Sequence, residues 1–329
     1  MDDATTGSST PMMTAVQQEV LGSVDVLHQV QVPRPVPGPG EVLIAVHAAG
    51  INPTDWGHRY GNMFLNHMPR ILGWDVSGVI EEVGLGVAVH EPGDEVFGML
   101  PYPKGVGSHA EYVVGPARAF VAKPPGIDHV QAGALPLVAL TAFQALVDTA
   151  KIQPGQRVLI HAAAGGVGHV AVQIAKARGA YVIGTASAGK HDLLRTLGAD
   201  ELIDYHETDF TTVVAPVDVV LDTLSGEVTR RSLSIIKPGG TLISLLGGAS
   251  EEDLEYARQH QVSVKTVLVE ADHASMLAIS CMVQDGQLQS VIAATFPLRD
   301  AAQAHLLGEE GRTTGKIVLT MKEDSAPSH

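Results

Sequence analysis

Two patterns of apolar and polar positions divide the chain, and the change between them lies near residue 131. In residues 13–121, short stretches alternate apolar with polar positions and are separated by turns, as half-buried strands are. The clearest example places Val42, Ile44 and Val46 on one face. The stretches with this character are 41–48, 76–83 and 95–100. Several such strands in succession predict a small β-rich barrel.

Beyond residue 131 the chain alternates helical periods with short apolar runs. The expected helices are 134–150, 191–197, 227–236, 275–284 and 301–307. The expected strands are 157–161, 181–185, 201–204, 217–222, 241–246, 262–270 and 316–320. Helices that separate strands predict a parallel, doubly wound sheet, with 262–270 at its edge.

One stretch, residues 157–178, combines a strand, a glycine turn and a helix in the order that binds phosphate. From Ala162 to Gly168 no side chain before Val167 is larger than a methyl group, so a pyrophosphate can approach the backbone. The following helix has free N–H groups and a dipole that favour an anion at its start. Its apolar face is formed by Val167, Val170, Ala171, Ile174 and Ala175. The unit predicts a dinucleotide fold with these residues at the phosphates: Ala164, Gly165, Gly166, Val167 and Gly168. The alternative is an α/β turn that binds no nucleotide.

The length and net charge of the chain limit the number of domains and the kinds of partner that we expect. A chain of 329 residues predicts about two domains. The formal net charge of −15 argues against nucleic acid and anionic membranes as partners, because both bind basic surfaces. No apolar run approaches the roughly 20 residues of a membrane span. Residues 1–12 lack the features of a signal peptide and are expected to form a mobile, disordered tail, so a cytoplasmic location is the default.

Cysteine is nearly absent, and the one cysteine of the chain is Cys281. A single cysteine excludes an intramolecular disulfide and any multi-cysteine zinc site. We expect Cys281 to be a small core residue on a helix.

Several short strings resemble the medium-chain dehydrogenase/reductase superfamily. Within it, they are most similar to the zinc-free quinone oxidoreductase, or zeta-crystallin-like, branch. The resemblance covers nearly the whole chain, and the strings are specific together rather than singly. They are 39–43 (PGEVL), 49–53 (AGINP), 73–79 (GWDVSGV), 92–96 (PGDEV), 162–168 (AAAGGVG), 197–200 (LGAD) and 315–318 (GKIV).

The resemblance implies an α/β fold in which a doubly wound parallel (Rossmann) sheet is inserted into a β-rich, GroES-like catalytic domain. The expected boundaries are residues 13–131 with 271–329 for the discontinuous catalytic domain and 132–270 for the NADP-binding domain. A small-molecule substrate is expected in the cleft between them. Most relatives are dimers, so a homodimer is expected here.

The resemblance also implies that a catalytic zinc site is missing. Zinc-dependent relatives have a cysteine where this chain has Asn52, and a histidine–glutamate pair where it has Trp74 and Asp75. Neither position keeps a thiolate or an imidazole, and the four-cysteine structural lobe is absent, so no metal ligand is assigned. Without zinc to polarise an alcohol, hydride transfer to a carbonyl-conjugated acceptor remains. The developing oxyanion of such an acceptor needs hydrogen-bond donors rather than a metal.

Asn52 is the first candidate for such a donor, or for orienting the substrate near the nicotinamide. Helix capping is an equally good alternative, because Asn52 is followed by a proline and, three residues on, by Asp55. In quinone-reducing relatives a tyrosine lies five residues after the asparagine, where this chain has Gly57. Asp55, Tyr60 and His58 are nearby candidates for the missing acid, and a loop or surface role is the alternative for each.

The choice between NADH and NADPH depends on the end of the second strand, near Thr185. NAD sites usually place an acidic residue there to bind the ribose hydroxyls, and residues 184–190 contain none. Ser187 can donate to a 2′-phosphate and Lys190 can neutralise it. The resemblance adds Tyr205 as a further contact to this phosphate. The sequence therefore predicts NADPH as the cofactor, unless Lys190 is only a solvated residue at a helix start.

Two loops are expected on the nicotinamide side, because ligands bind beyond the carboxyl ends of parallel strands. They are Asp222–Thr223 and the loop that contains Leu246 and Gly247. Thr141, on the helix before the glycine turn, resembles a nicotinamide contact of the family. Its alternative role is that of a helical threonine bonded to its own backbone.

The leading functional hypothesis is a zinc-independent, NADPH-dependent reductase that transfers hydride to a quinone or to an α,β-unsaturated ketone or thioester. The alternative is a non-catalytic NADPH-binding protein that acts as a sensor or scaffold, since the family's acid is missing at Gly57. A zinc alcohol dehydrogenase ranks third.

Overall fold

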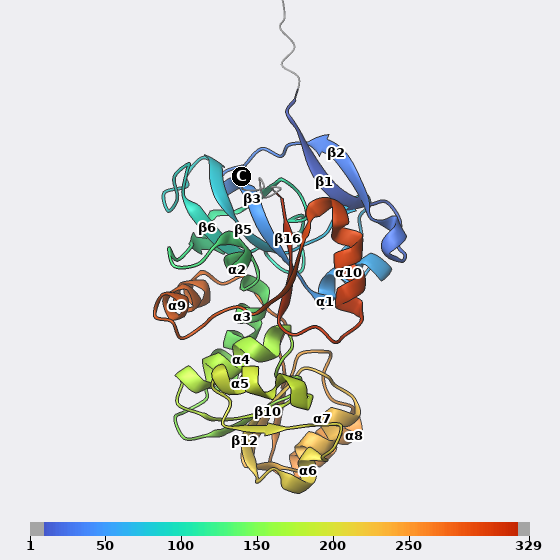
Figure 1. Cartoon of the computed structure of the whole chain (residues 1–329), viewed down its shortest axis with the longest axis vertical. Helices are drawn as coiled ribbons and strands as arrows, with labels where there is room; N and C mark the ends of the chain where they lie inside the picture. Colours follow the sequence, from blue (N-terminus) through green and yellow to red (C-terminus); the bar gives the residue numbers. More distant parts are fainter. Residues whose placement is uncertain (1–9, 322–329) are drawn as a thin grey trace, which may run out of the picture.

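The computed structural model describes residues 10–321, which form a β-rich half and a half of alternating helices and strands (Figure 1). The expected tail, residues 1–12, lies outside this range except for its last three residues, and Met12 already begins a strand. The closing residues after 321 also lie outside it. Within residues 10–321, no helix is both long and apolar enough to cross a membrane.

The lower half in Figure 1 is built on a six-stranded sheet in the order β11-β10-β9-β12-β13-β14, and its neighbouring strands run parallel. The strands are β9 (Arg157–Ile160), β10 (Tyr181–Thr185), β11 (Glu201–Ile203), β12 (Val217–Asp222), β13 (Ile236–Ser244) and β14 (Ser263–Thr266). The strand order reverses between β9 and β12, and in open parallel sheets ligands bind beyond the carboxyl ends of the strands at such a point. The glycine turn begins at this point.

Helices separate the strands of this sheet. They are α4 (Gly166–Ala177), α5 (His191–Thr196), α6 (Phe210–Val213), α7 (Glu227–Leu233) and α8 (Glu251–Gln259). In α4 the apolar face read from the sequence is turned inward, since Val170, Ala171, Ile174 and Ala175 are all fully buried. The predicted doubly wound parallel fold is confirmed.

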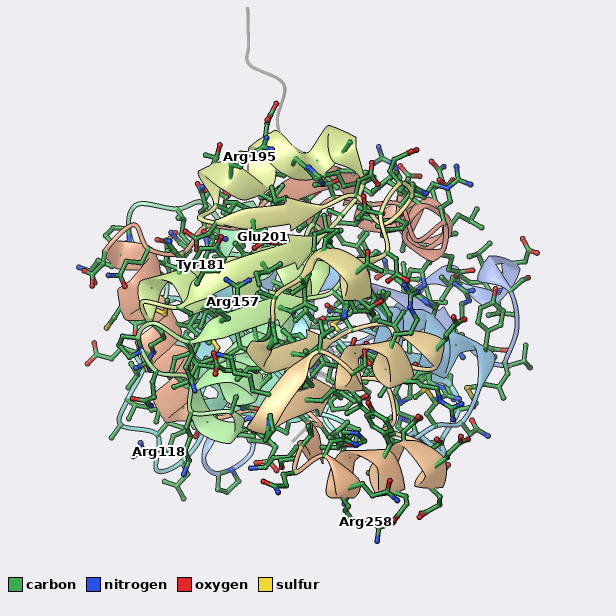
Figure 2. The ribbon with its side chains drawn as sticks, turned by 90° about the horizontal axis from the view of Figure 1, so that it is seen from below. Arg118, Arg157, Tyr181, Arg195, Glu201 and Arg258 are labelled. Atoms are coloured by element: carbon green, nitrogen blue, oxygen red, sulfur yellow. The ribbon has the colours of Figure 1, made fainter. Side chains whose placement is uncertain are left out.

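The amino ends of three neighbouring strands are joined on the surface opposite the glycine turn (Figure 2). Arg157, Tyr181 and Glu201 are the first residues of β9, β10 and β11. The Arg157 guanidinium lies 4.6 Å from the centre of the Tyr181 ring and 3.3 Å from a Glu201 carboxylate oxygen. These contacts link the three strands at the end that is not used for ligand binding.

The upper half in Figure 1 contains two further sheets. One has three strands, β1 (Met12–Gln18), β2 (His28–Pro33) and β4 (Arg70–Ile71). The other has seven strands: β3 (Glu41–Ile51), β5 (Asp75–Val83), β6 (Glu95–Met99), β7 (Tyr112–Pro116), β8 (Phe120–Ala122), β15 (Ile292–Pro297) and β16 (Lys316–Thr320). The expected β-rich, GroES-like region is thereby confirmed.

Helices of the β-rich half and of the connection to the sheet of parallel strands complete the fold. They are α1 (Pro53–Tyr60), α2 (His129–Gly133), α3 (Pro136–Phe143), α9 (His273–Gln284) and α10 (Ala301–Glu309). The last strand, β16, returns to the first half and pairs antiparallel with β3, where Ile317 lies opposite Ile51 (Figure 1). The residue that precedes Ile317, Lys316, therefore lies close to the start of α1.

Several sequence expectations were wrong in detail. Residues 227–236 do not form one helix, because Val217 N donates to Ile235 O and draws Ile236 into the sheet. The edge strand expected at 262–270 stops at Thr266, because the backbone of Glu270 bonds instead to the side chain of Gln144.

Two more differences concern helices. The helix expected at 134–150 is α3 followed by a π-helical turn, in which Ala150 N donates to Ala145 O. Cys281 lies on helix α9 as expected, but it is exposed. The helix buries Met276, Ile279 and Val283 instead, and Cys281 is not on that face.

One glycine is required by a close approach between α4 and the turn before it. A Cβ atom on Gly168 would lie 2.7 Å from the Cα atom of Ala163, with the carbonyl oxygen of Ala162 still nearer. Real Cβ atoms do not approach a backbone so closely, so this position cannot take a side chain unless the turn moves.

We expect Gly168→Ala to lower the free energy of unfolding by about 1–3 kcal/mol, the usual cost of overpacking a tight contact. Urea denaturation followed by fluorescence measures it. Gly126→Ala is the matched control, because a Cβ there meets nothing within 4 Å and the backbone is not left-handed. Equal losses for the two variants would contradict the close-approach argument.

Candidate active site

The glycine turn has the geometry expected of a phosphate site. Ala162 adopts a φ of 45°, and Gly165 N donates to Ala162 O over 2.8 Å, so the chain reverses tightly after β9. Helix α4 then begins at Gly166. The N–H groups of Gly166, Val167 and Gly168 lie in its first turn, where a helix offers them no acceptor of its own. They can bind an anion that arrives at the end of β9.

A buried histidine holds this turn in place. The Nδ1 atom of His169 lies 2.9 Å from Gly165 O, and its Nε2 atom accepts from Val291 N at 3.2 Å. A carbonyl only accepts, so Nδ1 carries the proton. Burial lowers the pKa of His169 to about 4, so the ring is neutral at pH 7. The turn is thus fixed to the segment that precedes β15.

The closing strand is also joined to the turn. Gly315 N donates to Ala164 O over 2.9 Å. A Cβ atom on Gly166 would lie 3.4 Å from Cδ of Lys316, so the lysine side chain runs directly beside the first residue of α4. The glycine turn and strand β16 of the β-rich half therefore contact each other through two neighbouring residues.

Lys316 ends in a buried cluster of polar groups. Its ammonium donates to Ile51 O at 2.8 Å, to the Oδ1 atom of Asn52, and to Oδ2 of Asp75 at 3.4 Å. Lys316 is 3% exposed, and both Asn52 and Asp75 are fully buried. A buried charge is tolerated only with such partners. The spacing of residues along the chain did not link Lys316 to Asn52. A lysine at the start of a buried apolar strand was nevertheless a signal that could have indicated a buried cation.

Asn52 is the N-cap residue of α1 and forms a capping box with Asp55, and its side chain has further partners inside the protein. The side-chain amide donates to Oδ2 of Asp75 at 2.9 Å, and its oxygen accepts from Lys316. Asp55 provides the other half of the capping box, because its Oδ2 accepts from Asn52 N at 2.7 Å, and its Oδ1 accepts from Gly73 N at 3.1 Å. The role of Asn52 as a hydrogen-bond donor to the substrate stays a prediction. In the structure its side-chain amide donates to Asp75 inside the protein.

Burial controls the charges of this cluster. It raises the pKa of Asp55 to about 7, against the effects of its backbone hydrogen bonds and of Lys316. Burial also raises the pKa of Asp75 and lowers that of Lys316, while their mutual attraction opposes both changes. Burial thus favours the protonated form of both carboxyl groups, and the pKa of Asp55 lies near 7 rather than at its ordinary value of 3.8.

The other acid candidates near α1 lie apart from one another. Tyr60 is 53% exposed, and its hydroxyl donates to Glu309 on α10 at 3.0 Å. His58 is fully buried, with Nδ1 2.8 Å from Thr54 O. At Gly57, where quinone-reducing relatives have tyrosine, a Cβ atom would meet the sulfur of Met63 at 2.9 Å. Met63 therefore occupies the space beside Gly57.

The residues predicted for the 2′-phosphate meet at the carboxyl ends of β10 and β11. Thr185 pairs with Ile203 in the sheet, and Ser187 and Tyr205 follow these residues by two positions each. Lys190 belongs to the same turn, and its ammonium donates to Arg312 O at 3.0 Å. The loop before β16 is therefore brought close to Lys190 through the backbone of Arg312, a residue that sequence reasoning missed.

An acidic residue does lie at this end, although not in the segment where it was sought. Asp204 accepts from Ala188 N at 3.2 Å and from His206 N at 3.0 Å. These N–H groups, that of His206 first, hold the pKa of the Asp204 carboxyl below its ordinary value. Its oxygens stabilise the turn that carries Lys190.

Some of the residues expected on the nicotinamide side already have hydrogen-bond partners within the protein, whereas others are exposed. The Asp222 carboxylate accepts from Leu224 N and Ser225 N, both at 2.9 Å, within its own loop. Thr141 donates to Leu137 O at 2.7 Å, as its alternative role requires. Leu246 is 59% exposed, and the adjacent Gly247 has a left-handed φ of 108°. Contact of Thr141, Leu246 and Gly247 with nicotinamide stays a prediction.

Comparison with known proteins identifies the family. Residues 38–125 match the alcohol dehydrogenase GroES-like domain, and residues 197–319 match the family described as zinc-binding dehydrogenase. The chloroplastic quinone-oxidoreductase QR1 of Triphysaria versicolor is 33% identical over 94% of this chain and 98% of its own length. The chain belongs to the medium-chain dehydrogenase/reductase superfamily.

Other members of this superfamily are similar over most of their length. The 2-haloacrylate reductase of Burkholderia sp is 35% identical, over 86% of this chain and 91% of that protein. The structure of the quinone oxidoreductase from Coxiella burnetii superposes with a TM-score of 0.89 at 36% identity, covering 95% of this chain and all of that one. Two polyketide synthase proteins of Streptomyces and the mycoketide-CoA synthase of Mycobacterium tuberculosis also match, but the chain spans only 14%, 8% and 7% of their length. QR1 and the Burkholderia protein, which are covered over most of their length, are described as a quinone-oxidoreductase and a reductase.

A zinc site of the kind that the family description names does not fit these residues. The oxygens of Asn52 and Asp75 face the Lys316 ammonium, and a cation cannot take the place of that ammonium while it is bound. Trp74, the residue before Asp75, offers an N–H group and no lone pair. In the described part of the chain, no group of three or more His, Cys, Asp or Glu residues is arranged to hold a metal ion.

Removal of the buried ammonium tests what the cluster contributes. We expect Lys316→Met to lower the free energy of unfolding by about 3–5 kcal/mol, because Asp75 then stays buried without its cation. Adding Asp75→Asn in the same chain should recover part of the loss. Chemical denaturation of the wild type, both single variants and the double variant measures the coupling.

The control is Lys176→Met, which breaks a 2.6 Å ion pair with Asp200 whose side chains are 46% and 25% exposed. A surface pair of this kind is worth about 0–1 kcal/mol. If Lys316→Met costs no more than this control, the buried cluster is not a structural requirement.

Proposed function

We propose that the protein is a zinc-independent, NADPH-dependent reductase that transfers hydride to a quinone or to an α,β-unsaturated carbonyl compound. The observation that carries the proposal is the contact between the glycine turn and the Lys316 cluster. It brings a dinucleotide-binding turn against Asn52 and Asp75, whose oxygens face an ammonium rather than a metal. Such a site suits acceptors that are already electrophilic.

The relatives support the same class of acceptor. QR1 and the Coxiella burnetii protein are described as quinone oxidoreductases, and the Burkholderia protein as a 2-haloacrylate reductase. A haloacrylate is an α,β-unsaturated carboxylate, so both acceptor types of the proposal occur among similar proteins. A small-molecule substrate and a homodimer remain part of the proposal.

Each part of the cofactor has residues that would hold it. The first N–H groups of α4 would bind the pyrophosphate, and Gly168 lets the helix approach the turn. Ser187, Lys190 and Tyr205 would bind a 2′-phosphate. When bound, NADPH supplies the hydride. The chain's own residues would hold the acceptor beside the nicotinamide and exclude water from the buried cluster around Lys316.

Steady-state oxidation of NADPH with a panel of 1,4-quinones, enones and enoyl thioesters tests the reaction. We expect turnover with at least one class of acceptor. A zinc chelator should not change the rate, because the oxygen of Asn52 is bonded to the Lys316 ammonium and not to a zinc ion. Asn52→Ala should lower the rate. Tight NADPH binding without turnover of any acceptor would instead favour the sensor or scaffold.

The cofactor preference is tested by titration of NADPH and NADH into the protein. Lys190→Ala should weaken NADPH binding about 10- to 100-fold, the value of one charge-assisted hydrogen bond, and leave NADH binding unchanged. Lys237→Ala is the control, because this lysine bonds to Asp218 at 2.8 Å near the amino ends of the strands. Equal affinities for the two nucleotides in the wild type would refute the NADPH assignment.

A further inference from the structure

A tyrosine that the sequence did not single out lies beside the start of α1. Tyr102 follows β6, whose Met99 is paired with Asp75. The hydroxyl of Thr54 lies 3.1 Å from the Tyr102 hydroxyl, and Thr54 is only two residues after Asn52. Tyr102 is half-buried, so part of it remains accessible. A phenol is thus brought from a distant loop to the end of α1 that meets the Lys316 cluster.

The hydrogen bonds around Thr54 leave the Tyr102 proton free. His58 Nδ1 lies 2.8 Å from Thr54 O, and a carbonyl only accepts, so Nδ1 carries a hydrogen. It therefore cannot accept from the Thr54 hydroxyl, although the two atoms are 3.1 Å apart. The Thr54 hydroxyl donates to the Tyr102 oxygen instead. Tyr102 accepts this bond and can give its own proton to another group.

Aromatic neighbours fix the orientation of the phenol. The Tyr102 ring lies edge-on to Trp74 at 5.3 Å between centres, to Phe64 at 5.9 Å and to His58 at 6.3 Å. Such edge-to-face packing holds a ring in one position. Trp74 stands where zinc-dependent relatives are expected to have a metal ligand, so Tyr102 packs against the centre of the site.

We propose that Tyr102 is the general acid of the reductase, which protonates the substrate carbon next to the carbonyl after hydride has reached the β-carbon. The inference rests on the proposed function. Hydride leaves NADPH with its electron pair and forms the new C–H bond at the β-carbon, which leaves NADP⁺ and an enolate. The Tyr102 O–H bond then breaks and a C–H bond forms at the α-carbon. The phenolate, held by the Thr54 hydroxyl, regains a proton from solvent.

The surroundings of Tyr102 keep its phenol protonated. Burial, with the nearby Asp55 carboxyl, raises the pKa of Tyr102 above its ordinary value of 10, against the Thr54 hydrogen bond. The phenol therefore stays protonated at neutral pH. It can then give its proton to the basic α-carbon of an enolate. Tyr60 is less suitable, because its hydroxyl is directed to Glu309 on α10.

This assignment separates the two acceptor classes. Reduction of an enone or enoyl thioester requires a new C–H bond at the α-carbon, which is slow without a positioned acid. Reduction of a quinone gives oxygen anions that water protonates rapidly. Tyr102 thus points to α,β-unsaturated carbonyl compounds as the substrates for which the site is built.

The test compares wild type with Tyr102→Phe in NADPH oxidation with an enone, an enoyl thioester and a 1,4-quinone. We expect kcat for the enone and the thioester to fall about 100-fold or more, the usual contribution of a general acid, and kcat for the quinone to stay within about threefold. The Kd for NADPH should not change. Tyr256→Phe, on the surface of α8 and stacked on His260, is the matched control and should behave as wild type.

Three results would overturn the assignment. Wild-type rates with the enone and thioester in Tyr102→Phe would show that another group gives the proton. An equal loss with all three acceptors, with weaker NADPH binding, would show a structural role. A loss in Tyr60→Phe but not in Tyr102→Phe would transfer the role to Tyr60. In each case wild-type turnover would leave the proposed function intact, whereas no turnover by wild type with any acceptor would refute that function and the assignment with it.

Discussion

The arrangement of the site depends on one buried ammonium. Lys316 is the first residue of β16, and its side chain passes Gly166 of the glycine turn before it reaches Asn52 and Asp75. A lysine that is 3% exposed is stable as a cation only if oxygen atoms surround it, and the carbonyl of Ile51 completes the set. The position of α1 follows, because Asn52 is the residue immediately before that helix.

The same contact joins two parts of the chain that are distant in sequence. Gly315 N binds Ala164 O in the glycine turn, while the next residues of β16 pair with β3 of the β-rich half. An anion bound at the start of α4 would therefore lie close to the Lys316 charge and to the strand that positions Asn52. Cofactor binding and the shape of the acceptor site share one element, which gives a physical route for coupling between them.

The parts of the fold that could be predicted from sequence are those with a local cause. The glycine turn and α4 follow from small side chains and a helical period within some twenty residues, and both are present as predicted. Expectations failed where a distant partner decides the outcome: Ile236 joins the sheet through Val217, and the edge strand ends where Glu270 meets Gln144. Strand β15 was not predicted. It is held in the sheet by pairing with β16, and the pattern of apolar and polar residues within β15 does not reveal this partner.

The candidate site shows the same division. Ser187, Lys190 and Tyr205 could be grouped from sequence because parallel strands bring their carboxyl ends to one edge. The roles at α1 could not be resolved, since Asn52 and Asp55 fit a capping box equally well until the contacts of both side chains were known. The structure shows that Asn52 and Asp55 form the capping box together and that Asn52 also binds the Lys316 and Asp75 side chains. Asn52 is therefore held with its amide turned toward Asp75 and Lys316. An amide donates hydrogen bonds but does not give up a proton, so a step that transfers a proton needs a different kind of side chain.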